Sequence, residues 1–148
     1  MLATTHTLVS AAIITKVTPP YLSLPLVLIS HYILDSIPHW DTGTGLTKGL
    51  KTKKTAFWET IVDLAIAGSL VFYLFQLNKD FSALLWFAFV LGITPDLVEF
   101  PVLFLNKKPR LLEKIIEFHD RFHQRAKLPW GLIPQIIIIL AIIFLNLN

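Results

Sequence analysis

The sequence has no cysteine and few charged residues, and each shortage excludes a class of protein. Without cysteine, none of the 148 residues can form a disulfide or supply a thiolate to a metal. Only 16% of the residues are charged, against about 25% in an ordinary soluble domain. A net charge of +3 gives no reason to expect a specific nucleic-acid partner.

Apolar residues are in excess: they make up 54% of the chain and gather in blocks of membrane-spanning length. We therefore expect an all-α fold, a single membrane-embedded domain over residues 1–148 that forms a small polytopic helix bundle. Five membrane helices are expected, at about residues 4–17, 21–37, 56–77, 81–105 and 130–147. The first is short, which leaves open whether it spans. It has no basic stretch before it, so we expect a retained helix rather than a cleaved signal.

The remaining segments have different characters. Residues 42–54 form a Gly/Thr/Lys loop without periodicity, whereas residues 111–126 predict an amphipathic helix. His119 and His123 fall on the apolar face of that helix. In the fourth membrane segment, the order Thr94, Pro95 predicts a break or kink, with Thr94 as the N-cap of a new helix.

The positions of lysine and arginine predict the orientation. Eleven of the thirteen lie in the 42–54 loop or in the 106–127 region, which an out-and-back pair of helices places on one side of the membrane. By the positive-inside rule that side is the cytoplasm. We therefore expect a cytoplasmic (inner) membrane protein with a cytoplasmic N-terminus and the amphipathic helix on the same side.

The ionisable residues converge on this cytoplasmic end, where a polar site is expected. His31 and Asp35, Glu59 and Asp63, and His119 and His123 are each four residues apart, so each pair projects from one helix face. Histidine and carboxylate ligands suit zinc, manganese or iron, and helix bundles build metal sites from facing helices. We expect one to three divalent ions, with zinc favoured. The expected ligands are His6, His31, Asp35, His39, Glu59, Asp63, Asp96, His119 and His123.

Each of these residues also has a plainer interpretation. His6 could be a surface imidazole, and His31 with Asp35 could be a private hydrogen-bonded pair. Asp96 could be an ordinary helix-start carboxylate, and a lysine from 51–54 could pair with Glu59 or Asp63. Asp41 and Glu99 are the expected general-base candidates, although Asp41 could instead cap the turn after Pro38.

Three stretches carry a family resemblance: "TTHTLVSAAI", "ISHYILDSIPHWD" and "LGITPDLVEF". Together they resemble the YdjM-like family of inner-membrane metal-dependent hydrolases over roughly residues 4–125. A more distant likeness is to zinc-dependent phospholipase C and P1-type nucleases. There "HYILD" is similar to a metal-binding H-x-x-x-D pair and His39 to the histidine that follows. Glu59 stands where the second pair has histidine, and the N-terminal tryptophan ligand of those enzymes is absent.

These observations favour a membrane-bound metal-dependent hydrolase that acts on a phosphoester or a phospholipid-like substrate at the cytoplasmic face. Membrane lipid is the expected partner. Two alternatives remain open: a transporter of metal ions or protons, and a non-catalytic scaffold in which metal or ion pairs only hold the bundle. A transporter needs polar groups along a path to the far side, and residues 64–91 offer few.

Overall fold

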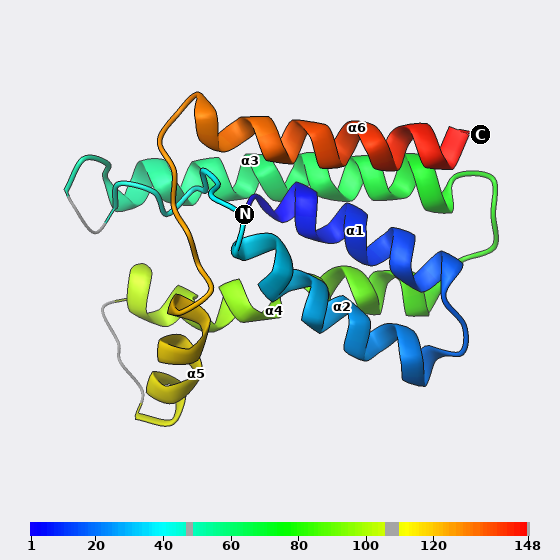
Figure 1. The fold of residues 1–148 in the computed structure, drawn as a ribbon, viewed down its shortest axis with the longest axis horizontal. Coiled ribbons are helices and arrows are strands. Elements are labelled where there is room, and N and C mark those ends of the chain that lie inside the picture. Colours follow the sequence, from blue (N-terminus) through cyan, green and yellow to red (C-terminus); the bar gives the residue numbers. More distant parts are fainter. Residues whose placement is uncertain (47–48, 106–109, 148) are drawn as a thin grey trace.

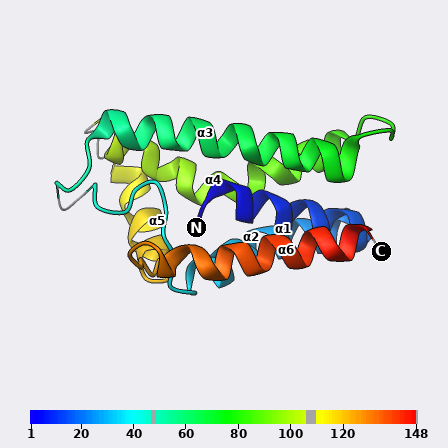
Figure 2. The ribbon, with the colours of Figure 1, turned by 90° about the horizontal axis from the view of Figure 1, so that it is seen from above.

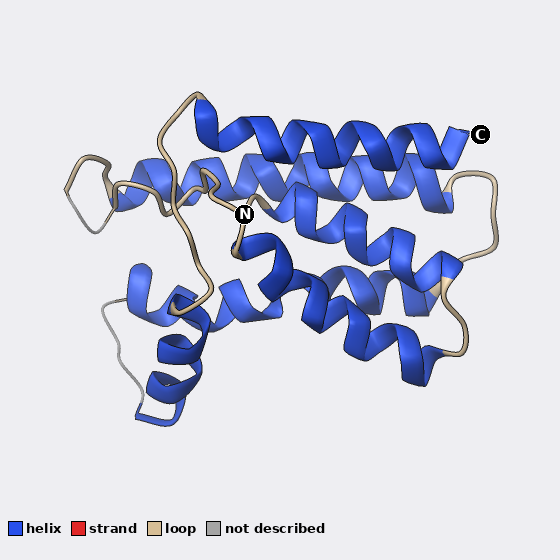
Figure 3. Cartoon of the chain, in the orientation of Figure 1, coloured by secondary structure: helices blue, strands red, loops and turns tan. Residues whose placement is uncertain are grey.

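The computed structural model describes residues 1–46, 49–105 and 110–147, and within these ranges it contains helices and no strand (Figure 3). The expectation of an all-α fold is confirmed. The helices are α1 (Ala3–Lys16), α2 (Pro20–Asp35), α3 (Lys53–Val71), α4 (Ala83–Leu103), α5 (Arg110–Asp120) and α6 (Ile133–Leu147). A π-helical turn, Phe72–Gln76, prolongs α3, and a 3-10 turn, Trp130–Leu132, precedes α6.

Helix α1 is the centre of the bundle and packs against α2, α3, α4 and α6 (Figures 1 and 2). Its sequence suits this position because five of its eight buried residues are threonine, serine or alanine. Buried hydroxyls need partners: Ser10 Oγ donates within the helix, to the His6 carbonyl oxygen at 2.7 Å, whereas Thr4 Oγ1 donates to Asp63 on α3 at 2.6 Å. Small side chains with satisfied hydroxyls let four helices approach α1 closely.

Helices α1 and α4 approach each other closely at Gly92. A Cβ atom built on Gly92 would lie 2.1 Å from Ser10 Oγ and 3.1 Å from Ser10 Cβ. The missing side chain therefore fixes how near α4 comes to α1. The same glycine presents its carbonyl oxygen to His31 on α2, so this contact also positions a histidine.

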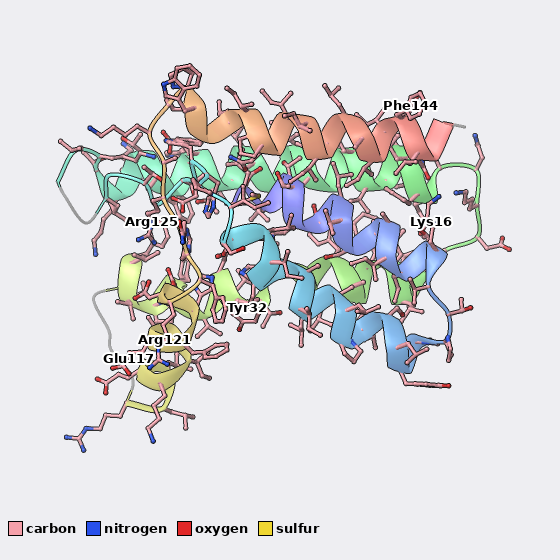
Figure 4. The ribbon with its side chains drawn as sticks, in the orientation of Figure 1. Lys16, Tyr32, Glu117, Arg121, Arg125 and Phe144 are labelled. Carbon is pink, nitrogen blue, oxygen red and sulfur yellow. The ribbon has the colours of Figure 1, made fainter. Side chains whose placement is uncertain are left out.

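The two ends of the bundle differ in chemistry. At one end, called the polar end below, α1, α3 and α6 begin, α2 and α4 end, and α5 is attached (Figure 1). Figure 4 shows Arg121 and Arg125 at the polar end and Lys16 at the other. The expected basic residues Lys48, Lys107 and Lys108 lie outside the described residues. At the opposite end Gln76 closes the α3–α4 turn, donating to Asp80 O at 2.8 Å and accepting from Ser82 N at 3.1 Å.

Among the described residues, two helices are long and apolar enough to cross a membrane, fewer than the five expected. They are Lys53–Gln76 and Ala83–Leu103. The other three apolar helices are shorter, and α1 is too enclosed by its neighbours to face lipid. Many large apolar side chains are exposed on α2, α3, α4 and α6, as expected for helices in contact with lipid.

Two local expectations are wrong: a helix break at Pro95 and an amphipathic helix that reaches residue 126. Helix α4 is continuous through Pro95, which contradicts the expected break but not its alternative, a kink. Thr94 does not begin a new helix: its hydroxyl donates back to Val90 O at 2.9 Å. The amphipathic helix ends at Asp120 rather than at residue 126, since the chain beyond it turns away to pair with the segment after α2. His123 therefore lies outside the helix that carries His119.

Gly92→Ala should destabilise the protein, because the new methyl group must displace Ser10 from its bond to His6. We expect a loss of about 1–3 kcal/mol in unfolding free energy, measured by thermal unfolding in detergent. Adding Ser10→Ala should recover part of the loss. Gly68→Ala is the matched control, since no atom lies within 4 Å of its added Cβ. Equal melting temperatures for Gly92→Ala and Gly68→Ala would contradict the proposed close approach.

Candidate metal centre

The polar end is organised around Asp35, the last residue of α2, whose side chain is fully buried. The Nε2 atoms of three histidines lie close to its carboxylate. His6 is 3.1 Å from Oδ1, while His31 and His119 are 3.2 and 2.9 Å from Oδ2. The Met1 amino nitrogen also contacts Oδ1. Helices α1, α2 and α5 thus each bring one imidazole to a single carboxylate.

Two more histidines, from segments outside the helices, complete the group. His39 Nε2 lies 3.6 Å from Asp35 Oδ1, and His123 Nδ1 lies 3.7 Å from Oδ2. Backbone pairing holds them there: His39 N donates to Gln124 O at 3.0 Å, and Gln124 N donates to Asp35 O at 2.9 Å. The chain after α2 and the chain after α5 therefore form a short bridge that fixes both imidazoles.

Aromatic packing attaches α5 to α2 beside this group. The Tyr32 ring meets those of Phe118 and Phe122 edge-on, with centroids 5.4 and 5.5 Å apart. On the other side, the rings of His6 and His31 stack with centroids 4.1 Å apart. The imidazoles are thus held by packing as well as by hydrogen bonds.

Three of the histidines have their orientation fixed by the ring nitrogen that points away from Asp35. His31 Nδ1 donates to Gly92 O at 2.7 Å, and His39 Nδ1 donates to Ile37 O at 2.8 Å. His119 Nδ1 donates to Glu99 Oε1 at 2.6 Å. In a neutral imidazole only one nitrogen carries hydrogen, so the Nε2 atoms of His31 and His39 turn a lone pair toward the centre. Metal-binding histidines have this arrangement, with the outer nitrogen on a carbonyl or carboxylate.

Lone pairs that face a carboxylate repel it unless a proton or a cation lies between them. A proton can relieve part of this: burial disfavours charge on His119, but hydrogen bonds to Asp35 and Glu99 outweigh it and raise the pKa of His119 to about 10. Close contacts between ring nitrogens remain: the Nε2 atoms of His31 and His119 are 3.2 Å apart. His39 and His123 likewise approach to 3.0 Å between their Nε2 atoms. The Nδ1 atoms of His6 and His123 are buried without a hydrogen-bond partner in the described part of the chain.

The side chains form groups that could hold a metal ion, with ligand atoms within 4.8 Å of one another. One group is His31, Asp35, Asp96 and His119, and a second is Asp35, His39 and His123. A third combines Glu99 with His119 and His123. Nitrogen and oxygen ligands in these numbers suit zinc, manganese or iron. Because the first two groups share Asp35, its two carboxylate oxygens could serve two ions.

A cavity of about 100 Å³ gives access to this centre. Asp41, Asp96, Glu99 and His123 are among the residues that line it, and the Asp96 side chain is 32% exposed. Asp41 Oδ2 accepts from His123 Nε2 at 2.6 Å. Burial disfavours the charge of Asp41, but its hydrogen bonds with His123 and His39 outweigh burial and hold its pKa well below the usual range. An ionised carboxylate thus lies on the cavity wall.

Two of the expected ligands have other partners. Glu59 forms an ion pair with Lys51, one of the lysines considered as its alternative partner. Asp63 instead caps α1: it accepts from Ala3 N at 2.6 Å, Thr4 N at 3.1 Å and Thr4 Oγ1 at 2.6 Å. Asp63 lines the cavity, but neither carboxylate belongs to a group that could hold metal among the described residues. Glu99, expected as a general base, orients His119.

One structurally important residue escaped the sequence interpretation. Gln135 on α6 is buried, donates to Trp40 O and Gly131 O, both at 2.8 Å, and accepts from Leu2 N at 2.8 Å. It connects the start of α1, the segment after α2 and the start of α6. An isolated polar side chain in the apolar run "IPQIIIIL" could have identified it, because such residues in apolar helices need a specific partner.

No protein-family model, curated protein or solved structure matches the chain. The resemblance to inner-membrane metal-dependent hydrolases therefore rests on the three sequence stretches that carry it.

Asp63→Ala should lower stability without removing metal, because the side chain caps α1 instead of facing the histidines. We expect a loss of about 1–2 kcal/mol from the lost cap, seen as a lower melting temperature, with unchanged metal content per folded protein. Asp63→Asn keeps one acceptor oxygen and should cost less. Loss of metal from well-folded Asp63→Ala protein would show that Asp63 is a metal ligand after all.

Proposed function

We propose that this protein is a membrane-bound, metal-dependent hydrolase that acts on a phosphoester substrate at the cytoplasmic face of the membrane. One observation carries the proposal. Three histidines, His31, His39 and His119, have their outer nitrogen bonded to a fixed acceptor and their inner nitrogen turned toward one buried carboxylate. A divalent cation would balance that carboxylate and occupy the lone pairs together.

The residues divide into roles around Asp35. His31, His119, Asp96 and Asp35 would hold one ion, and His39, His123 and Asp35 would hold a second. A bound ion in such a site lowers the pKa of water and polarises a phosphoryl oxygen. The remaining residues position these ligands: Glu99 orients His119, and His6 stacks on His31.

The attacking water needs a hydrogen-bond acceptor that reaches the cavity. Asp41 lines the cavity, belongs to neither shared group and is held by His123. We therefore assign Asp41 to orient the attacking water; because the pKa of Asp41 is held well below the usual range, it is a weak proton acceptor. Arg125, whose Nε lies 3.5 Å from Asp41 Oδ2, provides the nearby positive charge that a phosphate would need.

The membrane placement follows from length, composition and charge. Helices α3 and α4 would cross the bilayer, with the shorter apolar helices packed around them. The lysines and arginines near α5 and the start of α3 would place the polar end in the cytoplasm. The metal centre would then lie at the depth of the lipid headgroups.

Metal content and turnover test this proposal together. Protein purified in detergent without chelator or affinity histidines should contain one to two zinc, manganese or iron ions per chain by mass spectrometry. It should hydrolyse bis(p-nitrophenyl) phosphate, and chelation should abolish that activity. Asp35→Asn and His119→Ala should lower metal affinity by about tenfold or more, and Glu99→Gln should lower it about 10–100-fold.

Asp120→Asn is the matched control, since Asp120 is exposed beside His119 and should keep wild-type metal and turnover. Folded wild-type protein that takes up no divalent ion would overturn the metal centre and favour a hydrogen-bonded scaffold. Stoichiometric metal without turnover on phosphodiesters or other esters would overturn the hydrolase and favour a structural or transport role.

A further inference from the structure

The cavity beside the metal centre has an amphiphilic lining. Asp41, Asp63, Asp96, Glu99, His123 and Arg125 supply its charged and polar groups. Its large apolar groups are Leu64 on α3, Leu97, Phe100 and Leu103 on α4, and Phe104 just after α4. A ligand that fills it must therefore carry a polar or charged group at one end and hydrocarbon at the other.

The apolar part lies between α3 and α4, the two helices that are long and apolar enough to cross a membrane. Both pack mainly on α1 and make few direct contacts with each other. Among the apolar lining residues, Leu97 on α4 is 46% exposed. Nearby, Phe57 of α3 meets Phe104 edge-on, with ring centroids 6.1 Å apart. The apolar lining is therefore accessible from the side of α4 that carries Leu97.

We propose that the acyl chain of a membrane phospholipid enters this groove sideways from the bilayer, between α3 and α4, and that its phosphate reaches the metal centre beside Arg125. This inference rests on the proposed function and names its substrate class. A water-soluble phosphoester would leave the walls formed by Leu64, Leu97 and Phe100 exposed to water, whereas an acyl chain covers them. The Arg125 guanidinium has donors beyond the Nε near Asp41 and can bind a phosphate with them.

The absence of cysteine makes a direct binding test possible, because a single introduced cysteine is labelled uniquely. Leu64→Cys, labelled through a flexible linker, places a fluorophore beside the groove without filling it. Ile66→Cys is the matched control: it lies two residues along α3, about 200° around the helix, and Ile66 is 48% exposed but does not line the cavity. The probe is phosphatidylglycerol brominated along one acyl chain, titrated at constant detergent concentration.

We expect quenching at Leu64→Cys to saturate at about one lipid per protein and to be reversed by unbrominated phosphatidylglycerol. Quenching at Ile66→Cys should rise in proportion to the lipid added, without saturation. Leu97→Trp, which fills the groove, should weaken the saturable quenching at least tenfold, whereas Val90→Trp on the exposed part of α4 should not.

Equal, unsaturable quenching at both labelled positions would overturn the groove. If metal uptake and hydrolysis of bis(p-nitrophenyl) phosphate persist in that case, the proposed function stands with a different substrate. Saturable quenching without any turnover would instead support lipid binding in the groove and contradict the proposed hydrolase activity. The two proposals therefore fail separately.

Discussion

A single buried carboxylate determines the architecture of the polar end. Asp35 is enclosed by five imidazoles, one each from α1, α2 and α5 and two from the segments that follow α2 and α5. An ionised carboxylate without compensating charge is too costly to bury. The Met1 ammonium group, which contacts Asp35, and one proton on His119 supply part of the compensation, and a divalent cation would supply it for the whole group. Most other features of this end hold these six side chains in place.

The supporting structure acts through close backbone contacts. Gly92 lets α4 approach α1 and presents its carbonyl oxygen to His31. The backbone bridge between His39 and Arg125 holds His39 beside His123. Gln135 joins α6 to the start of α1. A metal centre assembled from separate segments needs such fixed contacts, because each ligand must be placed within a fraction of an ångström.

The sequence predicted the all-α fold and the clustering of histidines at one end, because apolar blocks, prolines and four-residue spacings are local signals. It could not predict which residues meet. Glu59 and Asp63 share the spacing of His31 and Asp35, yet Glu59 pairs with Lys51 and Asp63 caps α1. Those outcomes depend on how the helices pack. The end of α5 at Asp120 was missed for the same reason, since pairing with the chain after α2 overrides helical periodicity.

X-ray absorption at the zinc edge tests the central claim most directly. Zinc-loaded protein should show a first shell of nitrogen and oxygen at about 2.0–2.1 Å with the scattering pattern of several imidazoles. Asp35→Asn should change that shell, and Asp120→Asn should leave it unaltered. A shell of water oxygens alone, or one that Asp35→Asn leaves unchanged, would show that the histidines around Asp35 do not form a metal centre.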